Sequence, residues 1–216
     1  KLLKLSHYRS MLTVNRHLFV RTACLLFSFS FFTAQGARQG DTLLAANAII
    51  LQLLMLLAYG FDGFAHAAEA LIGKAIGGKN LDAFYAACRA ITVWALFSAF
   101  AFTLIFFFAK EPLVYLFSDI ESLRLEVYQY YPWLLALPFI CIGGYQLDGI
   151  FIGAGKSAGM QTSMLFSVFL IYLPLWWFTQ SLGNHGLWLA FCAFNLARTL
   201  SMYILYVRYS HSKSWI

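Results

Sequence analysis

Long apolar stretches separated by short polar turns dominate this chain. A window of about 19 residues picks out stretches that cover residues 17–36, 43–73, 84–109, 127–153, 160–181 and 186–207. A helix needs about 20 apolar residues to cross a bilayer, so each stretch is long enough, and the longest require a tilt, a kink or an extension into water. Pro132, Pro138 and Pro174 lie inside these stretches and predict bends. The pattern predicts an all-α polytopic membrane protein with six transmembrane helices.

Glycine-rich turns join the predicted helices. The sequence reads GKAIGGKN at 73–80, GAGKSAG at 153–159 and LGNHG at 182–186. These runs suit tight connections between antiparallel helices and leave no room for a soluble domain. Residues 1–16 alternate leucines with basic residues, which is typical of an interfacial amphipathic helix or of a basic linker. Residues 208–216 are predicted to form a cytoplasmic tail.

Composition supports a membrane protein. Hydrophobic residues make up 61% of the chain and charged residues 11%, whereas soluble domains carry about 25% charged residues. The net charge of +6 does not indicate a nucleic-acid partner, because the basic residues cluster just outside the apolar stretches. The four cysteines lie in different stretches without metal-ligand spacing, so we expect buried thiols and no metal site or disulfide. The expected surroundings are the lipid bilayer.

Lysine and arginine positions predict the orientation. With a cytoplasmic N-terminus, the outer side holds only Arg38, Lys110 and Arg124, and the outer loop 110–126 adds four acidic residues. The inner side then holds Lys1, Lys4, Arg9, Arg16, Arg21, Lys74, Lys79, Arg89, Lys156, Arg208 and Lys213. Cytoplasmic loops carry the excess of basic residues. We therefore predict a protein of the cytoplasmic (inner) membrane with both termini in the cytoplasm.

Three acidic residues interrupt the apolar stretches: Asp62, Glu69 and Asp148. A carboxylate at the bilayer centre costs about 2.5–3.5 kcal/mol on insertion scales, so such residues usually face a watery cavity, a partner or a transported ion. Asp62, His66, Glu69 and Gly73 share one face of a helix by their spacing. The stripe is interpreted as a cavity wall, a proton relay or a cation site. Water at the inner interface is the alternative explanation for His66 and Glu69.

The second acidic neighbourhood is the run GGYQLDGIFIGAG, which contains Asp148. Its glycines allow helices to approach closely or leave space for a ligand, and Tyr145 and Gln146 add hydrogen-bonding groups. Asp148 is alternatively a structural acid that bonds to a neighbouring helix end. Arg198, beside Asn195 in the last stretch, requires an intramembrane acid as partner or must snorkel to the inner surface.

Other polar and aromatic residues complete the candidates. Asn47 and Gln52 either join the cleft or form hydrogen bonds between helices. Several tryptophans, Trp188 and Trp215 among them, are expected at the membrane interface. The candidate residues of an ion or substrate cleft are therefore Asp62, His66, Glu69, Asp148, Gln146, Tyr145, Asn47, Gln52, Asn195 and Arg198.

The sequence shows no complete motif of the enzyme classes considered. The segment from His66 to Ala70 lacks the final histidine of a zinc-protease motif. The acid-bearing runs YGFDGF and YQLDGI lack the GxGD pattern of membrane aspartyl proteases, and GAGKS lacks the first glycine of a P-loop. We expect no enzyme activity, no metal and no cofactor.

Two segments resemble the multidrug and toxic compound extrusion (MATE) family. They are AANAIILQLLMLLAYGFDGFAHAAEALIGKAIGGKN in the second predicted helix and YQLDGIFIGAGKSAG in the fourth, and together with GNHGLWLA they look most like the DinF-like branch. The resemblance covers essentially the whole chain. It implies a two-lobe transporter with twelve helices, of which this chain is the C-terminal six-helix lobe and residues 1–16 the inter-lobe linker.

The resemblance implies an antiporter that exports cationic or amphipathic drugs in exchange for H⁺ or Na⁺. Its partner is the N-terminal six-helix lobe, and rocking of the lobes gives alternating access. Asp62 and Asp148 match acidic positions of family motifs. The stretch CLLFSFSF (24–31) has no acid where some sodium-coupled members carry a glutamate. The resemblance places the proton-coupling aspartate of DinF-like members on the other lobe.

Two other hypotheses remain open at this point. A lipid-linked saccharide flippase of the same superfamily would need several cations in its cleft to hold pyrophosphate, and only Arg198 is clearly intramembrane by sequence. A non-transporting membrane scaffold or enzyme subunit would not need the three intramembrane acids. The sequence therefore favours the drug antiporter.

Overall fold

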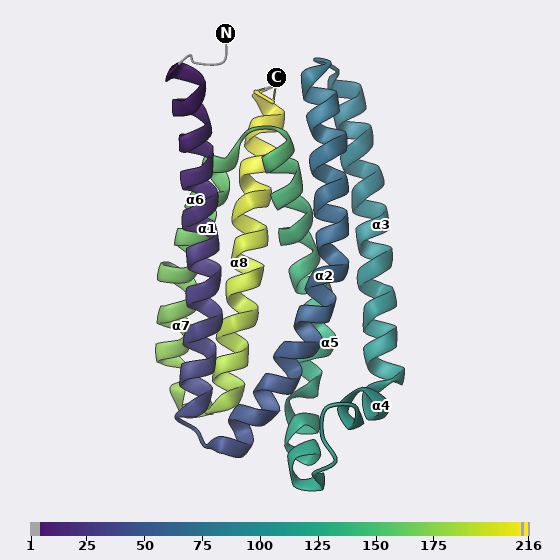
Figure 1. Cartoon of the computed structure of the whole chain (residues 1–216), viewed down its shortest axis with the longest axis vertical. Coiled ribbons are helices and arrows are strands. Elements are labelled where there is room, and N and C mark those ends of the chain that lie inside the picture. Colours follow the sequence, from purple (N-terminus) through teal and green to yellow (C-terminus); the bar gives the residue numbers. More distant parts are fainter. Residues whose placement is uncertain (1–4, 213, 216) are drawn as a thin grey trace.

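The computed structural model describes residues 5–212, 214 and 215, and this part of the chain is helical (Figure 1). Residues 1–4 of the predicted linker lie outside the described residues. The elements are α1 (Leu5–Ala37), α2 (Asp41–Gly77), α3 (Leu81–Phe108), α4 (Lys110–Tyr115), α5 (Glu121–Gly153), α6 (Ser157–Phe166), the π-helix η1 (Ser167–Tyr172), α7 (Leu173–Phe178), the 3₁₀ turn η2 (Gln180–Leu182) and α8 (Asn184–His211).

Six helical runs among the described residues are long and apolar enough to cross a membrane. They are residues 15–37 of α1, all of α2, α3 and α5, the run from α6 to α7, and α8. The predicted all-α fold with six transmembrane helices is confirmed. The helices are longer than the apolar stretches by a few residues at most ends, and α1 continues without a break through residues 5–16.

Close packing of α2 against α5 depends on two glycines spaced four residues apart. A side chain at Gly149 would collide with the backbone of Ala65 and would come within 2.8 Å of the Ala68 Cβ. At Gly153 a Cβ would lie 2.6 Å from the Glu69 carbonyl oxygen. Without Cβ atoms on this face of α5, the two backbones approach closely, as small residues permit in membrane helices. This contact fixes Asp148, the residue before Gly149, at the level of α2's acidic stripe.

The fifth span changes its winding before Pro174. Proline has no backbone N–H and cannot donate to the carbonyl of Leu170. The chain between Ser167 and Tyr172 is wound as a π-helix, and the N–H of Leu173 donates to the carbonyl of Val168. A π segment takes up an extra residue within an otherwise α-helical run. The predicted bend at Pro174 is therefore realised as this local change of winding.

Two of the tryptophans expected at the membrane interface are buried in the bundle. Trp188 is fully buried, and its Nε1 donates to the Asn47 side chain over 2.9 Å. Trp215 is 2% exposed and packs its ring against Phe84 and Phe151. The expectation was wrong for both, because the indole of Trp188 finds its hydrogen-bond partner inside the bundle and the chain after α8 folds back onto the helix ends.

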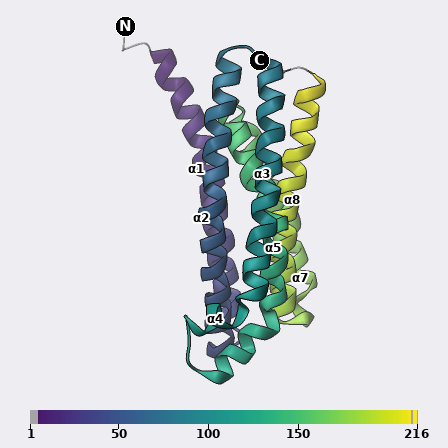
Figure 2. The same cartoon turned by 90° about the vertical axis from the view of Figure 1, so that its right-hand side faces the viewer.

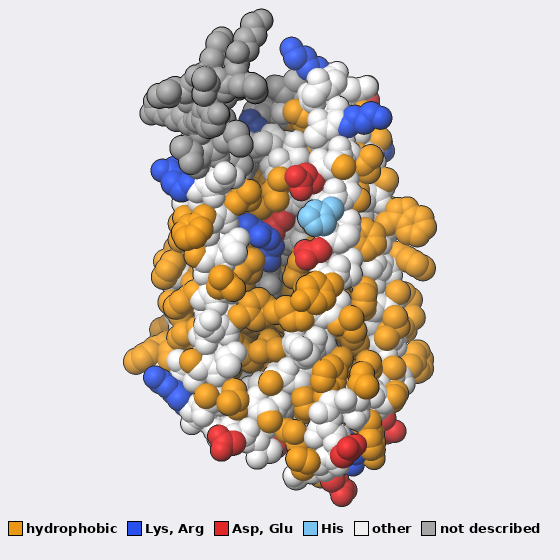
Figure 3. All heavy atoms as spheres, in the orientation of Figure 1, with side chains coloured by type: hydrophobic (Ala, Val, Ile, Leu, Met, Phe, Trp, Pro, Cys, Tyr) orange, Lys and Arg blue, Asp and Glu red, His pale blue; other side chains and the backbone are white. Residues whose placement is uncertain are grey.

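The ends of the bundle differ in charge. α1 begins and α8 ends at the same end, where the α2–α3 turn also lies (Figure 1). In Figure 2 the first part of α1 leans away from the other helices. Basic side chains gather at this end in Figure 3, whereas acidic side chains gather at the opposite end, near α4. The bundle end at which α1 begins and α8 ends is thus the basic one, and the end near α4 is the acidic one.

Candidate functional site

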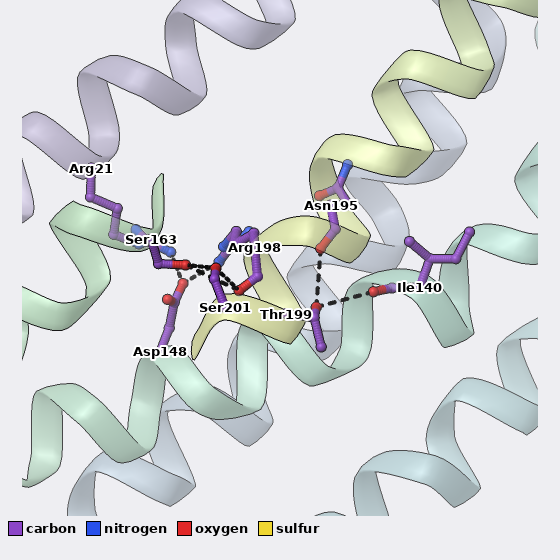
Figure 4. Close-up of polar contacts among 8 residues, drawn as sticks. All are labelled: Arg21, Ile140, Asp148, Ser163, Asn195, Arg198, Thr199 and Ser201. Atoms are coloured by element: carbon purple, nitrogen blue, oxygen red, sulfur yellow. Dashed lines mark hydrogen bonds and ion pairs between the residues drawn. The ribbon is translucent and has the colours of Figure 1, made fainter. Parts of the chain in front are cut away.

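Asp148 is the centre of a buried ion cluster. Arg198 of α8 and Arg21 of α1 both donate from Nη2 to its Oδ2 oxygen (Figure 4). The side chains of Asp148 and Arg198 are 4% and 3% exposed, and that of Arg21 is 20% exposed. Arg198 thus pairs with an intramembrane acid, the first of the two arrangements expected for it. The cluster joins three helices, α1, α5 and α8.

Glycines on α5 make room for the cluster. A Cβ at Gly143 would lie 2.5 Å from Thr199 Cγ2, and one at Gly144 would lie 3.4 Å from the guanidinium carbon of Arg198. The bare backbone of α5 therefore lets α8 approach until Arg198 reaches Asp148. Thr199 Oγ1 then lies 3.3 Å from the carbonyl oxygen of Ile140. The glycine run that the sequence suggested as ligand space is filled by side chains of α8.

Hydroxyl groups hold α6 against α8 beside Arg198. Ser163 Oγ donates to the carbonyl oxygen of Arg198 over 3.2 Å and contacts the hydroxyl of Ser201. Ser201 also donates to the carbonyl oxygen of Ala197 over 2.7 Å. These bonds fix the backbone of α8 at the turn that carries Arg198 (Figure 4). The arginine is therefore held from its backbone as well as from its guanidinium.

The charges of the cluster do not cancel. Two guanidinium groups and one carboxylate leave one net positive charge within the membrane-spanning region. The Nε atoms of Arg21 and Arg198 and the Oδ1 of Asp148 are buried without a hydrogen-bond partner in the part of the chain described. The net positive charge of the cluster disfavours a transported cation beside Asp148. The cluster therefore suits a positioning role better than a direct cation site.

Arg21 was missed as a site residue. Sequence reasoning assigned it to the inner side, because it lies only five residues into the first apolar stretch. The first span includes Asn15 to Ala37, so Arg21 lies inside it and turns toward Asp148. Arg21 therefore joins Arg198 as a partner of Asp148. No local sequence signal marks Arg21, because only the structure shows that α1 begins at Leu5 and so places Arg21 away from the helix end.

The acidic stripe of α2 lies on the surface of the bundle. Asp62, His66 and Glu69 are all exposed, and His66 Nδ1 lies 3.9 Å from Glu69 Oε2. Gln52 and Tyr59 are exposed on the same stripe, by their helical spacing. Figure 3 shows acidic, basic and histidine side chains together where this face is hollowed between α1 and α2. The polar face is thus shared between α2 and the edge of the arginine cluster.

Asn47 lies in a separate hydrogen-bonded group. Its Nδ2 donates to Asn184 Oδ1 over 2.8 Å, and Asn184 Nδ2 donates back to Asn47 Oδ1 over 2.9 Å. Trp188 Nε1 donates to the same Asn47 oxygen. All three side chains are buried. The group ties α2 to the start of α8 and matches the interhelical hydrogen bonding that the sequence left as the alternative for Asn47.

The remaining candidates lie in three different places. Gln146 Nε2 donates to Thr92 Oγ1 of α3, away from the acidic stripe. Asn195 Nδ2 donates to a carbonyl of its own helix, that of Phe191, over 2.9 Å. The Tyr145 ring lies 5.5 Å from the guanidinium of Arg198, within reach of a cation–π interaction. Of these residues only Tyr145 belongs to the arginine cluster.

The described residues include no group of histidine, cysteine and acidic side chains that could hold a metal ion. The four cysteines are free and buried, each in a helix. The chemistry that the site offers is therefore that of charges and hydrogen bonds within a membrane span.

The family model MatE matches residues 18–178. The chain belongs to the MatE family. This confirms the resemblance drawn from the motifs of the second and fourth helices. Membership of MatE, a family of transporters, also agrees with the lack of enzyme motifs.

Two bacterial relatives extend the MatE match. The chain is 34% identical over 218 residues to "DNA damage-inducible protein F" of Escherichia coli (strain K12), which covers 97% of this chain and 45% of that protein. It is 26% identical over 173 residues to "Uncharacterized transporter YisQ" of Bacillus subtilis (strain 168), covering 76% of this chain and 35% of that protein. The first match lies in the C-terminal half of the relative. The chain spans less than half the length of either relative.

Solved MatE-type structures share the fold. The eukaryotic MATE transporter AtDTX14 superposes with a TM-score of 0.83 at 15% identity, over 95% of this chain and 48% of that one. A MATE in complex with MaL6 gives a TM-score of 0.84 at 18% identity, over 98% and 49% of the two chains. The six spans therefore have the fold of about half of such a transporter, and the MatE chain is an integral membrane protein.

Proposed function

We propose that this chain is the C-terminal lobe of an antiporter that exports cationic or amphipathic small molecules in exchange for H⁺ or Na⁺. The N-terminal six-helix lobe of the same transporter is its partner, and rocking of the two lobes gives alternating access. Membership of the MatE family supports the transport activity. A chain that spans 45% of its E. coli relative supports the role of a single lobe.

The exposed acidic stripe of α2 carries this proposal. Asp62 and Glu69 lie within a membrane span and on the surface of the lobe. At the bilayer centre a carboxylate that faces lipid would cost about 2.5–3.5 kcal/mol, so the face at Asp62 borders water or the other lobe. Glu69 lies eight residues before Gly77, the last residue of α2, where water at the inner interface reaches it. Carboxylates at a watery cleft attract cations, which suits both a coupling ion and a cationic substrate. The Asp148 cluster holds Arg21 at the edge of the same face and limits how many cations can gather there.

The charge at the two ends supports the orientation. Lys74, Lys79, Lys156 and Arg208 belong to the turns and helix end near the termini. The opposite end carries the acidic segment around α4. Because cytoplasmic loops carry the excess of basic residues, we place both termini in the cytoplasm and the protein in the cytoplasmic membrane.

The test uses the complete two-lobe protein reconstituted in liposomes, with ethidium as the cationic probe. An imposed pH or Na⁺ gradient should drive ethidium transport, and the gradient that works identifies the coupling ion. Asp62→Asn should lower the rate and change its dependence on pH, because the variant removes a charge from the cleft. Glu111→Gln, which changes an exposed acid in α4, is the matched control and should transport as the unaltered protein does. Unchanged transport by Asp62→Asn would sink the proposed role of the stripe.

A lipid-linked saccharide flippase is the second candidate, and the intramembrane position of Arg21 is the observation that favours it. Arg21 and Arg198 both lie in membrane spans and face Asp148. Both, however, donate to the same oxygen of Asp148, so the cluster offers one net positive charge to a diphosphate that carries more than one negative charge. The drug antiporter therefore remains the better-supported function.

A further inference from the structure

A cavity lies on the other side of α5 from the ion cluster. Its volume is about 460 Å³, within the range of ligand pockets, and it is bounded by α3, α5 and α8. Gln146 lines it, whereas Asp148, two residues further along α5, points to nearly the opposite side of that helix. The cavity is therefore independent of the acidic stripe and of the arginines discussed above.

The cavity is a groove that opens sideways. α3 and α8 each pack along α5 and make little contact with one another, so α5 forms the floor. Gly143 lines the floor, and the side chain of Thr199 packs against its bare backbone. The rim carries Val93, Leu200 and Tyr203, which are 66%, 52% and 54% exposed. All of these residues lie in helices long and apolar enough to cross a membrane, and an apolar rim of this kind suits contact with lipid.

One end of the groove carries a positive charge. Arg89 lines the groove and is exposed, and within the described residues it has no acidic side chain at ion-pair distance. It lies eight residues after Leu81, the first residue of α3, which is about 12 Å along the helix. A long arginine side chain reaches the headgroup level from that depth. The groove is thus basic near the membrane surface and apolar toward the bilayer centre.

We propose that this groove binds one anionic phospholipid, with the phosphate at Arg89 and an acyl chain along Val93, Gly143 and Leu200. Basic pockets between transmembrane helices on the cytoplasmic side are a recurrent way to bind anionic headgroups. Arg89 lies toward the end of the bundle that we assign to the cytoplasm, the side on which membranes carry anionic lipid. The site goes beyond the proposed transport function, and lipid binding is measured without transport.

Native mass spectrometry of the complete two-lobe protein tests the site, with phosphatidylglycerol and phosphatidylcholine of identical chains as probes. The unaltered protein should bind its first phosphatidylglycerol about five-fold more tightly than phosphatidylcholine, the factor expected for one arginine near the membrane surface. Arg89→Gln should abolish this preference. Val93→Trp, which fills the groove from an exposed position and keeps Arg89, should weaken binding of both lipids. Arg38→Gln, an exposed arginine at the other end of the bundle, should change neither.

A second measurement locates the lipid. Phosphatidylglycerol with a photoreactive group on its acyl chain should crosslink to residues 88–93 and 199–206, and not to residues 62–69. Equal affinity for the two lipids, no effect of Arg89→Gln, or no effect of Val93→Trp would each overturn the proposal. Crosslinking to residues 62–69 in place of the groove would overturn the proposal as well. Absence of crosslinking because a helix of the other lobe covers the groove would also overturn it.

Discussion

Arg21, Asp148 and Arg198 form the buried ion cluster of the lobe. Such a cluster is weak evidence that the fold is stabilised by it. Taking ions out of water is expensive, and their mutual attraction repays the cost only with good geometry. Here two donors share one carboxylate oxygen, and three polar atoms of the cluster have no hydrogen-bond partner among the described residues. The cluster therefore specifies the positions of α1, α5 and α8 more than it stabilises the fold.

This view predicts opposite outcomes for two sets of substitutions. Asp148→Ala leaves two arginines without their carboxylate, so we expect a loss of about 3–5 kcal/mol, the cost of breaking a buried pair. The triple variant Arg21→Met, Asp148→Leu and Arg198→Met removes all three charges and should be close to the stability of the unaltered protein. Thermal unfolding of the purified two-lobe protein in detergent measures both. A triple variant less stable than Asp148→Ala would show that the cluster itself stabilises the lobe.

The sequence drew attention to Asp148 and Arg198 because each is a charge in the middle of an apolar stretch. Arg21 escaped notice because a basic residue near the start of a stretch is common at membrane interfaces. Its role depends on how far α1 extends before the bilayer and on which helix packs beside it. Both are properties of tertiary packing that the local pattern of residues does not carry.

For the helices, the contact between α2 and α5 determines where the acidic stripe lies relative to Asp148. Gly149 and Gly153 allow the contact because any side chain there would meet the backbone of α2. The contact therefore sets how far the arginine cluster on α5 lies from the exposed acidic face of α2. Loss of either glycine would therefore separate the two polar groups as well as weaken the packing.

Two glycine-to-alanine variants test this contact. Gly149→Ala places a methyl group against Ala65 and Ala68, and overpacking of this kind costs about 1–3 kcal/mol. Gly63→Ala is the matched control on α2, since a Cβ there has no neighbour within 4 Å and alanine favours a helix by about 1 kcal/mol over glycine. The midpoint of thermal unfolding should fall for the first and stay or rise for the second. Equal midpoints would contradict the close contact between α2 and α5.

The existence of the six spans could be predicted because apolar length alone decides which segments cross a bilayer. The short helix α4 and the π segment η1 could not. α4 lies in a loop of mixed composition, and η1 looks like any other apolar run apart from the nearby Pro174. Gly143 and Gly144 stand out in the sequence, but their role, to admit Thr199 and Arg198, depends on residues more than 50 positions away in the chain.

In the lobe as a whole, two exposed faces differ in character. The face of α2 carries Asp62 and Glu69, whereas α3 exposes Trp94 and Phe97. Both faces are exposed in the isolated lobe, yet only an apolar face is stable against lipid. In the proposed two-lobe transporter, we therefore expect the acidic face at Asp62 to meet water or the partner lobe, and the apolar face of α3 to meet the bilayer.

Thiol labelling separates the two faces. In the complete protein, Asp62→Cys should react with a membrane-impermeant maleimide, because a thiol reacts as a thiolate in contact with water. Phe97→Cys, equally exposed on the lobe but directed to lipid, should stay unlabelled. The four native cysteines are buried and provide the background rate. Labelling of Phe97→Cys together with protection of Asp62→Cys would reverse the assignment of the faces.

The family and the all-α fold could be predicted from motifs whose residues are adjacent in sequence. The arrangement of the candidate site could not, because its residues belong to helices that pack only through tertiary contacts. Asn47, Gln146 and Asn195 are polar residues of the same kind by sequence, yet each satisfies its hydrogen bonds in a different part of the bundle. The sequence therefore identifies the polar residues within apolar stretches, whereas the tertiary packing determines which of them contact one another.

The π-helical turn before Pro174 has a consequence for comparing this chain with its relatives. Such a turn holds one residue more than the α-helix around it, so the helix faces before and after it are offset by one position. A relative that lacks the additional residue between Ser167 and Tyr172 would keep the same packing on both sides with ordinary winding. An alignment of such sequences should therefore place a gap of one residue inside this helix, where gaps are normally avoided.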